Sequence, residues 1–113
     1  MIQFSETMAR PPRCRAFTVT EDEKSVGTGT LAFFGRRVEI GVVAADGTVK
    51  DFLLRGLLNV LSAMGGMVGV LSNVTAEFLG GEAYLAPFGF TKAPGLGYTV
   101  EAGEIRLNGK CKI

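Results

Sequence analysis

The chain contains no histidine and no tryptophan, and the lack of histidine removes several kinds of chemistry at once. Without histidine there is no Ser-His-Asp triad, no histidine-ligated metal and no imidazole base working near neutral pH. The two cysteines, Cys14 and Cys111, are too few for a thiolate metal site and have no histidine to activate them. We therefore expect no metal, and any catalysis has to use carboxylates, lysine, tyrosine or backbone groups.

Long apolar runs and an excess of one charge are also missing. No run reaches roughly 18 apolar residues, so no segment is expected to span a bilayer. Twelve basic residues stand against eleven acidic ones, which gives no reason to expect nucleic acid or a membrane surface as the main partner. The N-terminal residues lack the apolar core of a signal peptide, which predicts a cytoplasmic protein with two free thiols.

What is present suits one small globular domain. The 113 residues are 47% hydrophobic and 20% charged, enough to bury a single core. No repeat, low-complexity run or linker interrupts them, so we expect one domain over residues 1–113. The opening MIQFSETMARPP is expected to be irregular, because Pro11 and Pro12 would stop any helix there.

Three strands are predicted between residues 14 and 43. The segments CRAFTVT, SVGTGTLAFF and RVEIGVV are rich in β-branched and aromatic residues, and short polar turns separate them. Strands joined by such short turns predict an antiparallel meander.

A long helix is predicted after the third strand. Apolar residues recur at helical spacing from Val49 to Met64, beside a narrow polar stripe that includes Asp51 and Arg55. Thr48, with Asp51 three residues later, resembles a capping box at the start of this helix, and Gly65-Gly66 ends it.

The rest of the chain adds one parallel crossover. The apolar segment MVGVLSN is predicted to be a buried strand parallel to the third one, and residues 74–90 a short helix broken at Gly80-Gly81. The tail segments GYTVEAG and EIRLNGKCKI predict two or three more strands, with Asn108-Gly109 as a hairpin signal. The expected class is α+β: a mixed, mostly antiparallel sheet in the order β-β-β-α-β-α-β.

This order, with three local matches, resembles the GNAT superfamily of N-acetyltransferases, which move an acetyl group from acetyl-coenzyme A to an amine. Val38–Val43 leads into a helix, and Met67–Leu71 is followed by Ser72-Asn73. Tyr84–Phe90 is similar to the family's tyrosine-containing short helix that ends in a Gly-Phe pair. The resemblance covers roughly residues 14 to 113 and implies a GNAT-like fold.

The chain also departs from the family pattern. The family's first strand and first two helices, which help to form the acceptor side, are expected to be missing. The family's glycine-rich cofactor loop is replaced by ADGTVKDF, whose one glycine is Gly47. Tyr84 stands one residue before the position of the family's tyrosine, which Leu85 occupies. These departures indicate a truncated or degenerate member.

The resemblance implies a set of site residues. Glu39 points to the sheet face opposite Val38 and Ile40, and it stands where the family often has the glutamate base that deprotonates the amine. Tyr84 would be the acid toward the leaving thiolate. Backbone amides at the third strand and the helix start would hold acetyl-CoA, and Asn73 would hydrogen-bond its pantetheine arm or the acceptor. This implied cofactor-binding set is Val42, Val43, Gly47, Thr48, Val49, Lys50 and Asn73.

Each of these residues also has a plainer interpretation. Glu39 is then a solvated or ion-paired carboxylate, residues 47–50 an ordinary helix start capped by Thr48, Asn73 an N-cap and Tyr84 a packing residue. Two functions therefore remain open. One is an acetyl-CoA-dependent N-acetyltransferase acting on an unknown small-molecule or peptide amine, and the other is a non-catalytic GNAT-like module for ligand binding or assembly.

A homodimer is also predicted. Without the family's N-terminal helices, one face of the sheet would lie bare, and an apolar face of that size is normally covered by a partner.

Overall fold

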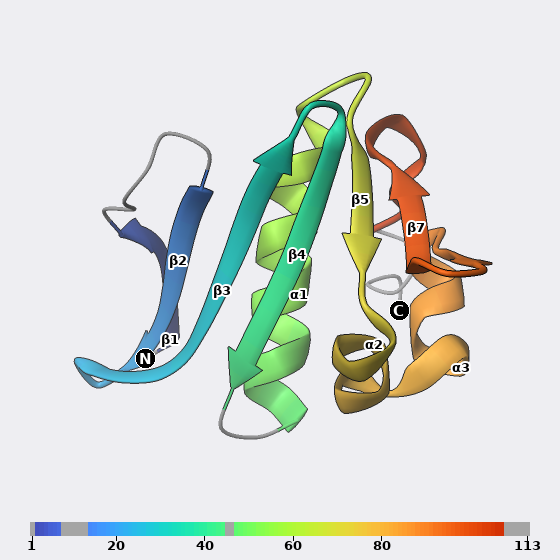
Figure 1. The fold of residues 1–113 in the computed structure, drawn as a ribbon. Helices are drawn as coiled ribbons and strands as arrows, with labels where there is room; N and C mark the ends of the chain where they lie inside the picture. The colour runs from blue at the N-terminus through green and yellow to red at the C-terminus, as the bar shows by residue number, and fades with distance from the viewer. Residues whose placement is uncertain (1, 8–13, 45–46, 108–113) are drawn as a thin grey trace.

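The computed structural model describes residues 2–7, 14–44 and 47–107, and every structural statement below refers to this part of the chain. It forms a seven-stranded sheet in the order β1-β2-β3-β4-β5-β7-β6, with helices against it (Figure 1). The strands are β1 (Ile2–Thr7), β2 (Cys14–Glu21), β3 (Lys24–Phe34), β4 (Arg37–Ala44), β5 (Val68–Leu71), β6 (Thr91–Ala93) and β7 (Gly97–Glu101). The helices are α1 (Gly47–Ser62), α2 (Asn73–Leu79) and α3 (Gly81–Leu85), with short 3-10 turns η1 (Ala86–Phe88) and η2 (Ala102–Glu104).

The predicted α+β class is confirmed. Strands β2, β3 and β4 form the expected antiparallel meander, and β4 pairs with β5 in parallel through the α1 crossover. The β2–β3 turn places Asp22 and Glu23 at φ 53° and 68°, the left-handed conformation that two-residue hairpins require. The alternation of β2 to β4 turns one apolar row toward α1, including Phe17, Leu31 and Val38, all almost fully buried.

Helix α1 is the centre of the core. Its fully buried side chains are Leu53, Leu54, Leu57, Leu58 and Leu61, each contributing about 2 kcal/mol by burial. The helix begins at Gly47, so Thr48 lies inside its first turn. The expectation that Thr48 caps this helix is therefore wrong.

The chain opening is not irregular throughout, as the sequence had led us to expect. Ile2–Thr7 forms strand β1, which pairs antiparallel with β2 and lies at one edge of the sheet. Phe4 stacks on Phe17 with ring centroids 5.2 Å apart. Its ring fills the space above Gly56, where a Cβ would lie 2.6 Å from a Phe4 ring carbon. Pro11 and Pro12, on which the expectation rested, lie outside the described residues.

The C-terminal part follows the prediction only in outline. The helix break at Gly80-Gly81 is confirmed, with both residues at positive φ. Strand β6 pairs with β7 but falls on Thr91–Ala93, where no strand was expected. Residues 105–107 form no strand, and the Asn108-Gly109 hairpin signal and Cys111 lie outside the described residues. Cys14 is a free thiol.

One face of the sheet is left without a helix in the described part of the chain. Figure 1 shows α1 behind β3 and β4, with the opposite face toward the viewer. Alternation places Thr18, Thr28, Thr30, Ala32 and Gly41 on this open face. The same face also carries Val43 and Phe34, which are 72% and 47% exposed, so threonine and small residues are mixed there with exposed apolar side chains. The homodimer stays a prediction.

Candidate functional site at the end of β4

Strands β4 and β5 separate halfway along β4. Their register pairs Arg37 with Val68, Val38 with Gly69 and Glu39 with Val70, and the pairing ends there. Strand β4 nevertheless continues to Ala44, and the two strands diverge toward their carboxyl ends (Figure 1). We call this gap in the pairing the β4–β5 opening. The carboxyl ends of parallel strands are a common place for ligands in sheets that have helical crossovers.

The backbone of β4 offers unpaired groups to this opening. The N–H of Val68 donates to the carbonyl of Arg36 at 2.8 Å, and alternate residues of a strand turn their backbone groups to the same neighbour. Val38, Ile40 and Val42 therefore face β5, whereas Val43 faces its β3 partner. Because the β5 pairing has already ended, Val42 presents its N–H and C=O to the opening. Of the two implied cofactor-binding valines, only Val42 has its backbone in position.

Two pockets lie along the opening. The Glu39 pocket, of about 410 Å³, lies on the open face of the sheet and extends to the β6–β7 turn; its lining residues are Thr30, Ala32, Glu39, Ile40, Gly41, Val70, Ser72, Gly95 and Leu96. The Val42 pocket, of about 250 Å³, lies between the end of β4 and α2; its lining residues are Val42, Val43, Val74, Thr75 and Phe78. The opening thus joins a pocket with a carboxylate to a pocket with an almost entirely apolar wall.

Glu39 lies in the first pocket and is also ion-paired. Its neighbours Val38 and Ile40 are buried toward α1, so its side chain points to the open face and is 51% exposed. Its Oε2 lies 3.5 Å from Nη2 of Arg37. An exposed pair at this separation is weak, so a ligand can compete with Arg37 for the carboxylate.

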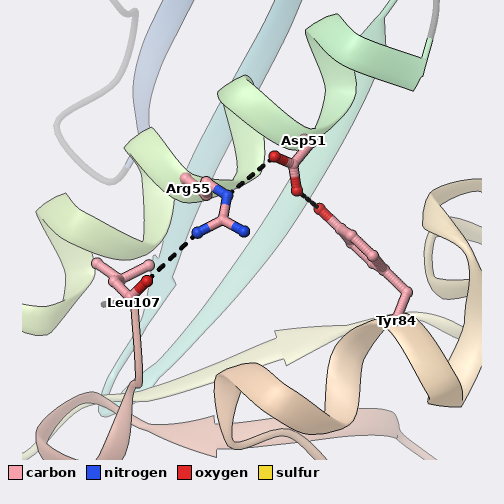
Figure 2. Close-up of polar contacts among 4 residues, drawn as sticks. All are labelled: Asp51, Arg55, Tyr84 and Leu107. Carbon is pink, nitrogen blue, oxygen red and sulfur yellow. Dashed lines mark hydrogen bonds and ion pairs between the residues drawn. The ribbon is translucent and has the colours of Figure 1, made fainter. Parts of the chain in front are cut away.

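Tyr84 is held on the other side of the sheet, against α1. Its hydroxyl donates a hydrogen bond to Asp51, whose second oxygen accepts from Arg55 at 2.9 Å (Figure 2). Arg55 also donates to the carbonyl of Leu107 at 3.3 Å. Burial and the hydrogen bond to Asp51 raise the pKa of the Tyr84 hydroxyl above its ordinary value. The structure therefore does not bring Tyr84 and Glu39 together, and the Tyr84 proton is held by Asp51.

The start of α1 has a lysine that is already engaged. Lys50 donates to the carbonyl of Phe78 at 2.6 Å, and its ammonium lies 4.6 Å from the centroid of the Phe78 ring. Phe78 is near the carboxyl end of α2, where a cation satisfies free carbonyls. Lys50 thus ties α1 to α2 at the wall of the Val42 pocket. Thr48 is exposed and Val49 is buried, so Val49 can offer a ligand only its backbone.

Ser72, not Asn73, caps α2. The Ser72 hydroxyl accepts a hydrogen bond from the backbone N–H of Thr75 at 3.2 Å. Asn73 is the first residue of the helix and is exposed. The interpretation of Asn73 as an N-cap is therefore wrong by one residue, and its role toward a cofactor stays a prediction.

Several pocket residues were missed by the sequence analysis. Leu96 reaches the Glu39 pocket from the β6–β7 turn, which the sequence did not place. Val74 and Phe78, 81% and 41% exposed, form the outer wall of the Val42 pocket from α2. Their spacing of four residues places them on one face of a short helix, so this apolar face could have been predicted from the sequence.

Metal and membrane features are not seen in the ranges that the structure describes. No three side chains of the histidine, cysteine, aspartate or glutamate type gather there as a metal site. None of the helices in these ranges has both the length and the apolar character needed to cross a bilayer.

Comparison with solved structures identifies a protein of similar fold. No family model and no curated protein matches the sequence. The structure is similar to the crystal structure of the ribosomal-protein-S18-alanine N-acetyltransferase from Escherichia coli, with a TM-score of 0.63 over 82% of this chain and 72% of that chain. The two sequences are 16% identical, so the likeness shows the fold alone. The chain has a GNAT-like fold, as its sequence had indicated.

Proposed function

We propose that the chain is an acetyl-CoA-dependent N-acetyltransferase whose reaction takes place at the β4–β5 opening. This proposal depends on one observation: the β4–β5 pairing ends at Glu39 and Val70, and the Glu39 pocket and the Val42 pocket lie along the opening that follows. Acetyl transfer requires a thioester and an amine to meet at one point. The apolar Val42 pocket suits the pantetheine arm, and the Glu39 pocket suits the amine.

The cofactor would use backbone groups more than side chains. The arm would lie along the free edge of β4 and exchange hydrogen bonds with Val42, as an added strand does. The diphosphate would meet the N–H groups in the first turn of α1, from Gly47 to Lys50, at the positive end of the helix dipole. Because Thr48 is not the cap, its side chain does not compete for these donors. Asn73, exposed at the start of α2, is the proposed partner of the arm.

The chemistry then needs one base. The amine first loses its ammonium proton to solvent, and the neutral nitrogen then attacks the thioester carbonyl carbon while Glu39 removes a second proton, directly or through water. The carbon–sulfur bond breaks, the thiolate leaves with the electron pair, and it takes up the released proton. Thiols ionise near pH 8.5, at about the ordinary pKa of cysteine, so a thiolate is an acceptable leaving group without a dedicated acid. The proposal therefore leaves out Tyr84 as the acid.

An assay of thiol release tests this proposal. Acetyl-CoA is mixed with a panel of primary amines, and free coenzyme A thiol is followed for the wild-type chain, Glu39→Gln and Glu101→Gln. Loss of the base is expected to lower kcat about a hundredfold. The control removes an exposed carboxylate outside both pockets and should leave kcat unchanged. Equal kcat for Glu39→Gln would exclude Glu39 as the base, and no release with any amine would exclude the transferase.

A non-catalytic GNAT-like module is the second candidate. The engagement of the Tyr84 hydroxyl with Asp51 and of Lys50 with Phe78 favours it, because both groups serve packing between helices. This candidate predicts that acetyl-CoA or another small ligand binds at the opening with no thiol release.

A further inference from the structure

We infer that the acceptor taken by the Glu39 pocket is an ammonium group at the end of a methylene stem, as in an alkylamine or a lysine side chain. This inference deepens the proposed function by naming the class of amine. Its binding step needs no cofactor, so it can be tested apart from acetyl transfer.

The charge of the pocket selects a cation. Glu39 is the one ionisable side chain among the residues that line it. Its ion-pair partner is Arg37, 3.5 Å away and 44% exposed, and water already weakens that pair. An incoming ammonium can take its place on the Glu39 carboxylate. A ligand with its own carboxylate close to the amine would bring a like charge against Glu39.

A second oxygen lies on the neighbouring strand. Thr30 pairs with Gly41, which places it diagonally across from Glu39, within reach of a side-chain contact. A Cβ at Gly41 would lie 2.8 Å from the Thr30 Oγ1, so the glycine leaves this hydroxyl facing the pocket. A hydroxyl oxygen accepts a hydrogen bond from an ammonium group. The other lining hydroxyl, that of Ser72, is already used as the cap of α2.

The remaining walls suit methylene groups. Ala32, Val70 and Leu96 contribute apolar surface around the carboxylate. Leu96 is 46% exposed, so a stem lying against it would remove apolar surface from water on both sides of the contact. No lining side chain offers a cation for an anionic group of the ligand. The pocket therefore fits a charged end on an apolar stem better than a zwitterion.

Titration of the nitrogen-15-labelled chain with n-butylamine hydrochloride, followed by NMR at constant ionic strength, tests the inference. We expect saturable shifts of the Gly41, Gly95 and Leu96 amide signals. Glu39→Gln should raise the dissociation constant about tenfold, the usual effect of losing one charged hydrogen bond. Glu101→Gln, which removes an exposed carboxylate outside the pocket, should leave it unchanged. 4-Aminobutanoate, with the same stem and a carboxylate end, should bind about fivefold more weakly or worse.

A second ligand distinguishes a lysine side chain from a free alkylamine as the source of the ammonium group. If Nα-acetyl-lysine amide binds more tightly than n-butylamine, the acceptor is a lysine side chain; if it binds more weakly, the acceptor is a free alkylamine. The inference is overturned if butylamine shifts no pocket signal, if Glu39→Gln binds it equally well, or if 4-aminobutanoate binds as tightly. Amine binding without thiol release would exclude the proposed transferase and leave this site standing.

Discussion

Asp51 shows what single residues contribute to this fold. Its ion pair with Arg55, four residues later, was readable from the sequence because the spacing is that of one helical turn, and it is confirmed at 2.9 Å. The bond from Tyr84 to the same carboxylate was not readable, since tertiary packing alone brings α3 against α1. The sequence therefore predicted the Asp51–Arg55 pair and left Tyr84 open between a catalytic and a packing role.

The Tyr84→Phe variant tests this structural role. Loss of the hydroxyl is expected to lower the free energy of unfolding by about 1–2 kcal/mol at neutral pH, because a hydrogen bond to a carboxylate is lost. Urea unfolding measures the change. A thiol-release rate close to that of the wild type is expected as well.

The same variant has a signature at alkaline pH. Burial and Asp51 raise the pKa of the Tyr84 hydroxyl, so above about pH 10, where a tyrosine of the unfolded chain ionises, the folded chain keeps a proton that the unfolded chain releases. The contribution of this group is therefore complete below about pH 10 and decreases as the pH rises beyond it. Tyr84→Phe should lose less stability than the wild type between pH 9 and 11, roughly the range around that ionisation. Parallel curves would show that the hydroxyl is not held as described.

At the scale of elements, local patterns predicted what local forces determine. Helix α1 and the β2–β4 meander follow from periodicity and turn chemistry, and both are confirmed. Strand β1 was missed because its stability comes from a distant fit, the ring of Phe4 above Gly56, and from the two-bond pair between Arg15 and Glu6 at 2.8 and 2.7 Å. Leu96 was missed as a wall of the Glu39 pocket because only the folded chain brings it beside residues of β3 to β5.

The contact between Phe4 and Gly56 predicts that the effect of Gly56→Ala on stability depends on whether Phe4 is present. In the wild-type chain, Gly56→Ala should reduce stability, because the new Cβ would meet the Phe4 ring at 2.6 Å. In a Phe4→Ala background the same substitution should stabilise by about 0.5–1 kcal/mol, the helix propensity of alanine over glycine. Urea unfolding of the four chains gives both values. Destabilisation by the same amount in both backgrounds would contradict the contact.

Two glycines, Gly95 in the β6–β7 turn and Gly97 at the start of β7, are expected to respond differently to substitution. Gly97 has φ 112°, and a Cβ there would lie 2.1 Å from the carbonyl oxygen of Leu71. Gly95 has φ 84° and open space around it. We expect Gly97→Ala to cost about 3 kcal/mol or more and Gly95→Ala about 1 kcal/mol, measured by urea unfolding. Equal costs would show that β7 does not approach β5 this closely.

At the scale of the whole molecule, the sequence predicted the topology better than the site. The order of strands and the parallel crossover produce a GNAT-like sheet, and they depend on patterns spread over the whole chain. The site depends on where β4 and β5 separate and on which side chains turn to each pocket. Glu39 and Val42 keep the positions that the proposed function needs, whereas Tyr84 and Val43 do not.

The central claim, that the β4–β5 opening holds acetyl-CoA, is tested most directly by calorimetric titration of the chain with acetyl-CoA. We predict saturable binding of one cofactor per chain. Thr75→Phe, which fills the Val42 pocket, should weaken it at least about tenfold by steric overlap. Thr91→Phe, at an exposed position of β6 outside both pockets, is the matched control and should bind as the wild type does. No binding at near-millimolar acetyl-CoA, or equal binding by Thr75→Phe, would contradict the claim.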